Sequence, residues 1–282
     1  MRRYEAPAKV NLSLLVFPPR PDGYHSLESM VQTIEWCDTL DVEPGEEGSD
    51  TLETDIEDNL VERALHELRV IATVPPVSMR LTKEIPVAAG LGGGSSDAAA
   101  ALLAGAELGG LDVDLHEVAS RVGADVALFL TGGSLMMTGV GENIDPLPPL
   151  QGFAVAVAVP ELGISTQEAY RRWDDLEGPQ GTPVPDARLP PPLRGGMPMR
   201  NDLLPAALDL APALGDFMAD LASAWGTHVS LTGSGSGCFG YFASVDEAAD
   251  AAVAVSHLTR VARGVGLRAR GVSRAGSDPG DR

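Results

Sequence analysis

The chain has 282 residues, of which 44% are hydrophobic, and this is enough for one large hydrophobic core or two smaller ones. Its formal net charge at pH 7 is -20, because Asp and Glu outnumber Lys and Arg by 40 to 20. Binding to nucleic acid or to an anionic membrane surface requires clustered basic residues, so we expect neither as a partner.

The two cysteines, Cys37 and Cys238, are far apart and have no metal-ligand spacing, which argues against a disulfide framework and a zinc site. A reducing, cytoplasmic location is therefore expected. The N-terminal segment has early arginines as a secretion signal does, but Lys9 and Asn11 interrupt its apolar stretch and no cleavage pattern follows. The longest apolar runs, such as 153–160, have strand length and not the roughly 18 residues of a membrane helix.

The N-terminal part of the chain predicts several strands before its first strong helix. Helical spacing of apolar residues begins at Asp58 or Asn59, either of which could cap the helix, and continues to residue 72. The segments that favour strands are 9–17, 30–36, 38–44 and 77–86.

Residues 95–110 give the strongest helix prediction, with Ser95 or Ser96 as its N-cap, Asp97 in its first turn and Gly109 as its stop. A second helix is predicted from Asp114, with Glu117 completing a capping box and Gly123 as the C-terminal glycine. This pattern puts Asp125 just after a helix end.

The C-terminal part alternates strands and helices around a segment rich in proline and glycine, 177–198, which we expect to be a mobile loop. A helix after Ser244 has a second capping box, completed by Glu247. The predicted strands are 134–144, 152–160, 228–233 and 265–273, the helices are 214–225 and 245–258, a second glycine loop is 233–237, and residues 274–282 are expected to be disordered.

The glycine-rich segment 90–94 precedes two serines and a helix, and three phosphate-binding designs can be compared with it. A Walker loop requires a Gly-Lys pair, which occurs nowhere in the chain. The dinucleotide fingerprint needs glycine in place of Ser95 and an acid where Asp112 or Asp114 begins a helix, so it is a weak alternative. Two interpretations remain: backbone amides and a helix N-terminus that bind a di- or triphosphate, or glycines that allow close backbone packing.

Lys9 and Lys83 are the two lysines of the chain, and both lie where a nucleotide site would need a compact cation. Asp125 lies in an apolar segment, where burial requires a cationic partner, and Lys9 is a candidate. Such a pair could orient and deprotonate a hydroxyl nucleophile. The alternatives are a surface position for each lysine and a structural role for Asp125.

Eight segments match, in order, the pattern of one family. They are PAKVNLSL at 7–14, PDGYHSLESM at 21–30, DNLVERA at 58–64, PVAAGLGGGSSDAAAAL at 86–102, GADV at 123–126, GVGE at 139–142, NDL at 201–203 and LTGSGSGC at 231–238. The chain thus resembles the 4-diphosphocytidyl-2-C-methyl-D-erythritol kinases, a family of the GHMP kinase superfamily, over nearly its whole length. The glycine loop indicates the superfamily, and PAKVNL with DGYH is more specific to the family.

The resemblance implies an α+β, two-domain GHMP kinase fold with the active site between the domains. Residues 1–150 would form an N-terminal ATP-binding domain like domain 2 of ribosomal protein S5. Residues 151–272 would form a ferredoxin-like C-terminal domain, and residues 273–282 a disordered tail.

The resemblance also implies a reaction and its residues. ATP would phosphorylate the 2-hydroxyl of 4-diphosphocytidyl-2-C-methyl-D-erythritol in the non-mevalonate pathway to isoprenoids, with Asp125 as general base and Lys9 as the stabilising cation. The ATP-binding residues would be Pro86, Val87, Ala88, Ala89, Gly90, Leu91, Gly92, Gly93, Gly94, Ser95 and Ser96, with Asn59 and Lys83 near the adenosine. The substrate-binding residues would be Asn11, Tyr24, His25, Thr166, Gly233, Ser234 and Gly235.

Mg²⁺ is expected together with ATP because it neutralises the phosphates during transfer. No metal-binding residue is assigned, although Ser95 and Ser96 carry candidate hydroxyls. The expected partners are therefore ATP and a cytidine diphosphate-linked polyol, bound by a monomer or homodimer. The alternatives are a kinase acting on homoserine, mevalonate or a sugar, and a catalytically silent nucleotide-binding regulator.

Overall fold

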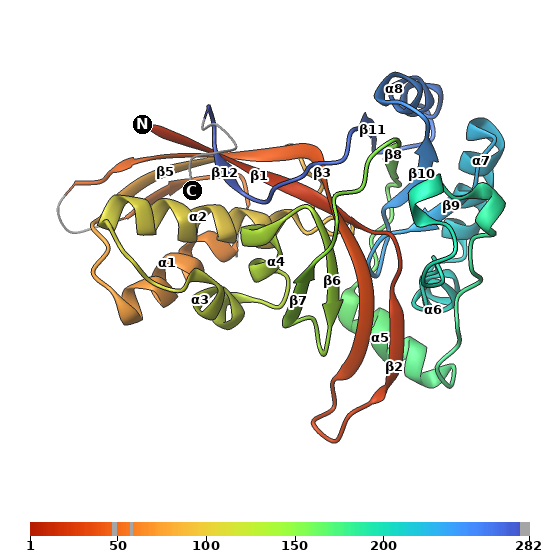
Figure 1. Ribbon diagram of the computed structural model, residues 1–282, viewed down its shortest axis with the longest axis horizontal. Helices are drawn as coiled ribbons and strands as arrows, with labels where there is room; N and C mark the ends of the chain where they lie inside the picture. The colour runs from red at the N-terminus through yellow and green to blue at the C-terminus, as the bar shows by residue number, and fades with distance from the viewer. Residues whose placement is uncertain (47–49, 57–58, 277–282) are drawn as a thin grey trace.

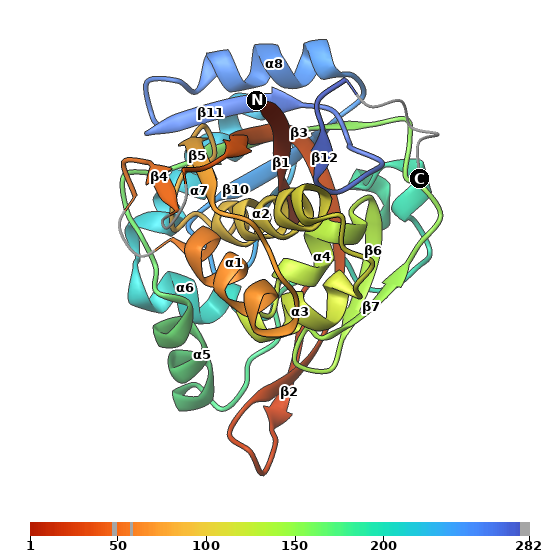
Figure 2. The same ribbon diagram turned by 90° about the vertical axis from the view of Figure 1, so that its left-hand side faces the viewer.

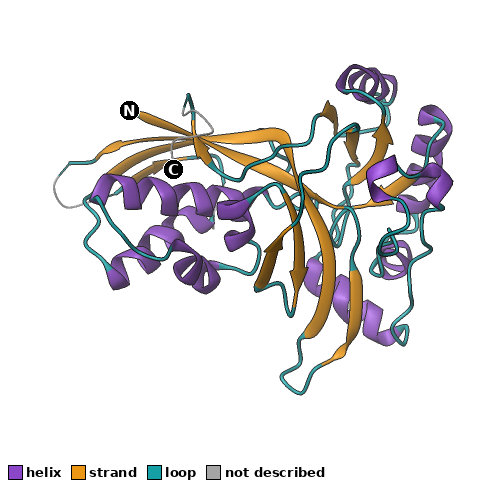
Figure 3. Ribbon diagram, in the orientation of Figure 1, coloured by secondary structure: helices purple, strands orange, loops and turns teal. Residues whose placement is uncertain are grey.

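The computed structural model describes residues 1–46, 50–56 and 59–276. Within these ranges the chain forms two β-sheets, one of eight strands and one of four, with helices packed against each (Figures 1 and 3). Asp58, one of the two candidate helix caps, and residues 277–282 of the expected tail lie outside the described residues.

The larger sheet is built mainly from the first half of the chain. Its strands are β1 (Arg2–Asn11), β2 (Leu15–Pro19), β3 (His25–Pro44), β4 (Thr51–Glu53), β5 (Val77–Thr82), β6 (Ser134–Thr138), β7 (Asn143–Pro146) and β12 (Ser273–Arg274). The main order is β12-β1-β3-β5-β4, while β2 and β6 also pair with β3, and β7 pairs with β6. Strand β3 has 20 residues and extends beyond the centre of the sheet. Its first residues pair with β2, and this β2–β3 hairpin lies beside the helix that follows Ser165 (Figure 1).

The boundaries of two predicted strands are wrong in the same region. The segments 30–36 and 38–44 belong to the single strand β3, and the interruption between them coincides with a shift in pairing register rather than a turn. Cys37 pairs with Pro7, whereas Ile34 pairs with Ala8. A β-bulge keeps a strand continuous while changing which side chains share a face, so the break in alternation was misleading.

Four helices cover one face of the larger sheet (Figures 1 and 2). They are α1 (Leu60–Ile71), α2 (Gly93–Gly109), α3 (Leu115–Val122) and α4 (Val126–Thr131). Asn59 caps α1 by accepting from the N–H of Val61, and Asp114 caps α3, so both predicted caps are confirmed. Helix α2 contributes a run of buried alanines that lets it approach the sheet closely.

The predicted start of α2 is wrong. The helix begins at Gly93 after Gly92, which has a left-handed φ of 73° and makes no side-chain cap. Ser96 is fully buried inside the helix, and Asp97 lies beyond its first turn. Glycine adopts a left-handed conformation without steric cost, so the backbone makes the turn here without a capping hydroxyl.

The smaller sheet carries the second group of helices. Its strands are β8 (Ala154–Val159), β9 (Val229–Leu231), β10 (Cys238–Phe242) and β11 (Val261–Val265), and its helices are α5 (Thr166–Asp175), α6 (Leu204–Leu210), α7 (Ala213–Trp225) and α8 (Val245–Ala254). The strand order β11-β8-β10-β9 and the chain order β-α-β-β-α-β give the expected ferredoxin-like arrangement. Ser244 caps α8 by accepting from the N–H of Glu247, as predicted.

The proline-rich segment 177–198 is packed against the protein, contrary to the expected mobile loop. It forms two short 3₁₀ turns, Asp186–Arg188 and Pro191–Leu193. Three of its apolar side chains, Val184, Leu189 and Leu193, are buried in the core that the two sheets share. Proline limits regular hydrogen bonding but still permits apolar burial, which the composition alone does not reveal.

The two sheets are joined by a common core and by the end of the chain. One hydrophobic cluster contains Trp36 of β3 together with Val155 of β8 and Phe239 of β10. After β11 the chain returns to the larger sheet, where Arg268 is buried and pairs with Glu5 at 2.8 Å. Ser273 and Arg274, assigned above to the tail, form β12. The domain boundary at residue 150 stays a prediction.

Candidate active site

A cleft of about 890 Å³ opens beside the beginning of α2, with walls from both parts of the fold. Most of the predicted site residues line it, although the first and the last of them, Lys9 and Ser234, lie far apart in the sequence. Those that line it are Lys9, Asn11, Tyr24, His25, Lys83, Pro86, Val87, Ala88, Ala89, Gly90, Leu91, Gly92, Gly93, Gly94, Ser95, Asp125, Thr166, Gly233 and Ser234.

One wall of the cleft is almost bare backbone. Gly90 and Gly92 have φ values of 72° and 73°, so the chain turns sharply into α2 at this wall. No side chain caps α2, and the first amides of an α-helix have no partner within the helix. The peptide dipoles add partial positive charge, so this wall suits a phosphate group.

The second glycine loop, 233–237, is held against the first. The N–H of Gly237 donates to the carbonyl of Ala89 at 3.1 Å, and the hydroxyl of Thr232 donates to the carbonyl of Gly90 at 3.2 Å. The amide of Asn201 donates to the carbonyl of Gly233 at 2.8 Å. These bonds bring a loop from the smaller sheet to the same cleft.

The contact between the loops predicts a stability effect. Gly90→Ala is expected to destabilise the protein by about 1–3 kcal/mol, because positive φ disfavours alanine. Its Cβ would also lie 2.2 Å from the carbonyl oxygen of Thr232. The thermal unfolding temperature of Gly90→Ala measures this loss of stability. Gly94→Ala is the matched control, since a Cβ at Gly94 would meet no atom within 4 Å. Equal unfolding temperatures for the two variants would contradict the prediction.

Lys9 is a buried cation in β1, with 4% of its surface exposed. Its N–H donates to the carbonyl of Leu91 at 3.0 Å, and its ammonium donates to the side-chain oxygen of Asn11. A Cβ on Gly92 would lie 3.2 Å from Cγ of Lys9, so the glycine leaves space for the lysine stem. Burial lowers the pKa of Lys9, and the charge of Asp125 opposes this shift.

Asp125 lies between α3 and α4 and reaches the same cleft. Burial and then the charge of Asp125 raise the pKa of Tyr170, which lines the same cleft, to about 12. Among the described residues, Lys9 and Asp125 are electrostatically coupled without forming a direct ion pair. The two predicted residues therefore line one cleft, and each influences the charge of the other there.

Asn11 lines the cleft and also forms hydrogen bonds that hold neighbouring residues in place. Its side-chain oxygen accepts from Lys9, and its amide donates to the hydroxyl of Ser29 at 2.7 Å. Its backbone N–H donates to the hydroxyl of Thr232 at 3.0 Å. Asn11 thus holds Lys9 in place and connects β1 to the second glycine loop.

Lys83 has partners that the sequence did not indicate. Its ammonium forms ion pairs with Asp38 of β3 and with Asp97 of α2, the latter at 2.6 Å. Lys83 lines the cleft while most of its side chain is buried. A position near adenosine stays a prediction, but the lysine is fixed by two carboxylates rather than free at the surface.

His25 and Tyr24 lie next to each other in the β2–β3 hairpin, but their side chains differ in how much of their surface is exposed. The His25 side chain is 7% exposed, and its two ring nitrogens lie 3.0 Å from the carbonyl oxygen of Phe17 and 3.2 Å from a carboxylate oxygen of Asp174. Its ring stacks on Tyr170 at 5.4 Å. Tyr24 is 66% exposed. The cleft therefore has one fixed imidazole and one accessible aromatic ring.

Helix α5 supplies cleft residues that sequence reasoning missed. They are Gln167, Tyr170, Arg171 and Asp174. A signal was present, because Ser165 is followed three residues later by Glu168, and the Ser165 hydroxyl accepts from the N–H of Glu168. Thr166 was assigned, and its hydroxyl lies 2.8 Å from that of Ser234, which connects α5 to the second glycine loop.

Three predicted site residues do not line the cleft. Asn59 caps α1, although the next residue, Leu60, is at the cleft wall. Ser96 is buried, and its hydroxyl has no hydrogen-bond partner. Gly235 faces Leu231, whose side chain would be 3.0 Å from an added Cβ.

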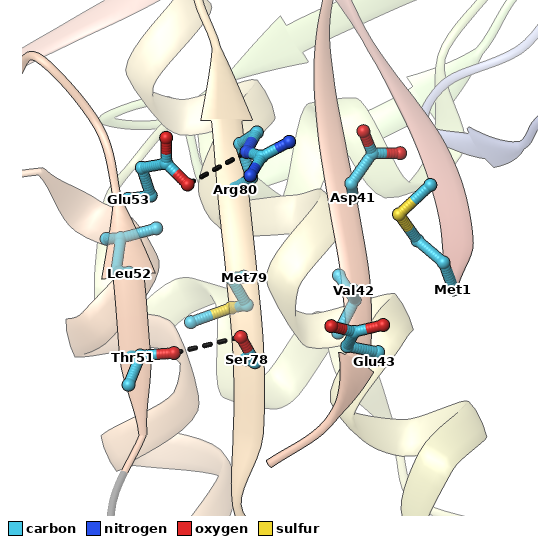
Figure 4. Close-up of a pocket in the computed structure, with 10 residues that line it drawn as sticks. All are labelled: Met1, Asp41, Val42, Glu43, Thr51, Leu52, Glu53, Ser78, Met79 and Arg80. Carbon is cyan, nitrogen blue, oxygen red and sulfur yellow. Dashed lines mark hydrogen bonds and ion pairs between the residues drawn. The ribbon is translucent and has the colours of Figure 1, made fainter.

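Another hollow, of about 470 Å³, is lined by Met1 and by residues of β3, β4 and β5 in the larger sheet (Figure 4). Its polar side chains are largely paired with one another: Arg80 donates to Glu53 at 2.8 Å, and Thr51 donates to Ser78 at 2.9 Å. None of the predicted site residues lines it. The cleft beside α2 is therefore the candidate active site.

Comparison with known proteins agrees with this geometry. The family model "GHMP kinases N terminal domain" matches residues 59–133, which include α1, the glycine loop and α2. Homoserine kinase from Cytophaga hutchinsonii has the same fold, with a TM-score of 0.69 at 17% identity over 97% of this chain and 96% of that one. The chain thus has the GHMP kinase fold, with the glycine loop inside the matched N-terminal region.

Closer relatives identify the family. The 4-diphosphocytidyl-2-C-methyl-D-erythritol kinase of Granulibacter bethesdensis is 39% identical over 88% of this chain and 87% of its own, and that of Rhizobium etli is 38% identical over 89% of both chains. A crystal structure of 4-(cytidine 5'-diphospho)-2C-methyl-D-erythritol kinase superposes with a TM-score of 0.81 at 36% identity, over 94% of this chain and 98% of that one. The chain belongs to the 4-diphosphocytidyl-2-C-methyl-D-erythritol kinase family and is a phosphotransferase with an alcohol group as acceptor.

Proposed function

We propose that this chain transfers the γ-phosphoryl group of ATP to the 2-hydroxyl of 4-diphosphocytidyl-2-C-methyl-D-erythritol. One observation carries the proposal: a single cleft contains the glycine backbone wall, the Lys9 and Asp125 charges, and the Tyr24–His25 pair. A phosphate donor, a catalytic pair and a pyrimidine-binding surface are the three parts that this reaction needs. The family membership supports the same substrates.

In this mechanism the protein positions two substrates and moves one proton. The amides at the beginning of α2 hold the phosphates, while the space between Lys9 and Asp125 receives the acceptor hydroxyl. Asp125 takes the hydroxyl proton as the oxygen attacks the γ-phosphorus in line. The Lys9 ammonium stabilises the charge on the transferring group, in a buried setting where its charge acts strongly.

We propose that Mg²⁺ accompanies ATP and neutralises its phosphate charge. Within the described ranges, no group of three His, Cys, Asp or Glu side chains could hold a metal ion. Mg²⁺ at nucleotide sites keeps waters and phosphate oxygens as ligands and needs only one or two protein oxygens. Of the two candidate hydroxyls, that of Ser95 belongs to a residue of the cleft wall, whereas Ser96 is fully buried and does not line the cleft.

A coupled ADP-release assay tests the proposed substrate. We expect ATP turnover with 4-diphosphocytidyl-2-C-methyl-D-erythritol and none above background with homoserine, mevalonate or galactose. Turnover with one of the other acceptors alone would assign the chain to a different reaction. ATP binding without turnover on any acceptor would favour a silent nucleotide-binding regulator.

The cytidine side of the cleft gives a separate prediction. His25→Ala is expected to raise KM for the cytidine substrate about tenfold or more, and to leave KM for ATP unchanged, since the His25 ring is held by Phe17, Asp174 and Tyr170. His116→Ala is the matched control because His116 is exposed on α3. Steady-state kinetics with each substrate varied in turn measure both constants. Equal KM values for the cytidine substrate in the two variants would exclude His25 from its recognition.

The cytoplasmic location and the monomeric or dimeric state stay predictions. Cys37 and Cys238 are both free, in keeping with a reducing compartment. Among the described residues, no helix has both the length and the apolar character needed to cross a bilayer.

A further inference from the structure

Helix α5 presents one continuous face to the cleft. The residues of this face are Thr166, Gln167, Tyr170, Arg171 and Asp174, and the steps of three and four residues between them are those of a single helix face. An α-helix rises about 1.5 Å per residue, so Thr166 and Asp174 lie about 12 Å apart along the axis. Arg171 lies between them, about 7.5 Å along the axis from Thr166.

The first residue of this face, Thr166, lies at the end of the cleft where phosphoryl transfer is proposed. Its hydroxyl is 2.8 Å from the hydroxyl of Ser234 in the second glycine loop. A Cβ on the neighbouring Gly233 would lie 3.4 Å from the side-chain nitrogen of Lys9. The N-terminal end of α5 is therefore connected, through this loop, to the surroundings of the Lys9 ammonium.

The last residue of this face, Asp174, lies at the end of the cleft proposed to bind the pyrimidine. Its carboxylate is 3.2 Å from a ring nitrogen of His25, and the His25 ring stacks on Tyr170. An acceptor that reaches from Lys9 to His25 therefore runs along α5. In the proposed substrate a diphosphate joins the polyol to the cytidine, so the diphosphate is expected between the two ends of this face, where Arg171 lies.

A bound diphosphate requires a cation, and the cleft of this acidic protein offers few. Among the described residues that line the cleft, the Lys and Arg side chains are those of Lys9, Lys83 and Arg171. Lys83 is already paired with two carboxylates, and the proposed mechanism uses Lys9 at the transferring group. The Arg171 side chain is 67% exposed, and its contact with Glu168 is 4.0 Å, which is too long for a hydrogen bond. The Arg171 guanidinium is therefore available to a ligand.

We propose that Arg171 binds the diphosphate of the cytidine substrate and thereby selects a nucleoside diphosphate derivative over a polyol without phosphate. This inference rests on the proposed function, because it requires that acceptor in the cleft. A guanidinium presents a planar fork of N–H donors that matches a pair of phosphate oxygens. Its charge also offsets the repulsion between the diphosphate and the carboxylates of Asp125 and Asp174, which line the same cleft. Arg171 binds the substrate and transfers neither a proton nor a phosphoryl group.

Two fragments of the substrate isolate the role of Arg171: cytidine, and cytidine 5'-diphosphate, which adds the diphosphate. Calorimetry measures the Kd of each for the full chain, with Mg²⁺ and a non-hydrolysable ATP analogue present to keep the fragments out of the ATP site. We expect wild type to bind the diphosphate about tenfold or more tightly than cytidine. Arg171→Gln is expected to bind cytidine as wild type does and to lose most of this preference. Arg171→Lys, which keeps the charge without the fork, is expected to retain part of it.

Arg172→Gln is the matched control, because it removes the same charge one residue further along α5, from a side chain that does not line the cleft and pairs with Asp209 at 2.6 Å. It is expected to keep the wild-type preference. In steady-state kinetics, Arg171→Gln is expected to raise KM for the cytidine substrate about tenfold, with kcat and KM for ATP unchanged.

The outcomes separate this inference from the proposed function. An equal preference for the diphosphate in wild type and Arg171→Gln overturns this inference alone, as does a parallel loss of cytidine binding in Arg171→Gln. Wild type that binds the two fragments equally has the same meaning. Failure of wild type to bind either fragment overturns the proposed cytidine substrate and this inference together.

Discussion

Asp125→Asn is expected to lower kcat by roughly 10²–10⁴-fold, the range typical of a lost general base. Asparagine has nearly the same shape as aspartate but cannot take the proton of the acceptor hydroxyl. Asp125 lines the cleft after α3, and the phosphate wall at the beginning of α2 does not depend on its side chain. We therefore expect the Kd for ATP to stay within about twofold of wild type.

Single-turnover kinetics and an ATP titration measure the two effects separately. Asp112→Asn is the matched control, since it makes the same chemical change at an exposed acid in the described part of the chain. Retained turnover in Asp125→Asn would refute the role of Asp125 as base. A parallel loss of ATP binding and turnover would indicate instead that Asp125 supports the shape of the cleft.

Lys9→Met is expected to lower kcat by roughly 10²–10³-fold, because it removes a buried positive charge from the transferring phosphoryl group. Methionine keeps an unbranched side chain of similar length in the space that Gly92 leaves. Burial lowers the pKa of Lys9, so the folded protein holds this ammonium at a cost. Removing the ammonium relieves this desolvation cost, but it also takes a hydrogen-bond donor from the buried side-chain oxygen of Asn11.

The combination of effects makes the Lys9 test specific. Thermal unfolding of Lys9→Met is expected close to the wild-type temperature, because relief of the buried charge offsets the lost bond to Asn11, while turnover falls. Arg121→Ala, which removes an exposed cation from α3, is expected to change neither kcat nor KM. Undiminished turnover in Lys9→Met would exclude Lys9 from catalysis, and unfolding of the variant at room temperature would show a structural role.

Several features of the fold follow from residues that interact within a few positions of one another. The caps at Asn59, Asp114 and Ser244 are confirmed because each depends on a side chain and a backbone N–H two or three residues later. The start of α2 was wrong because Gly92 makes the turn with its backbone conformation. A missed signal of the same local kind, at Ser165, would have predicted α5.

The sequence by itself determined which residues belong to the candidate site: the glycine wall, the two lysines and the Tyr24–His25 motif. These residues do line one cleft. Only the tertiary structure decided their partners. Lys83 pairs with Asp38 because β3 and β5 are neighbours in the larger sheet, and Thr232 contacts Gly90 across 142 positions because the two sheets share a core. Local hydrogen bonds are encoded in short segments, whereas such contacts depend on how strands pair and cores pack.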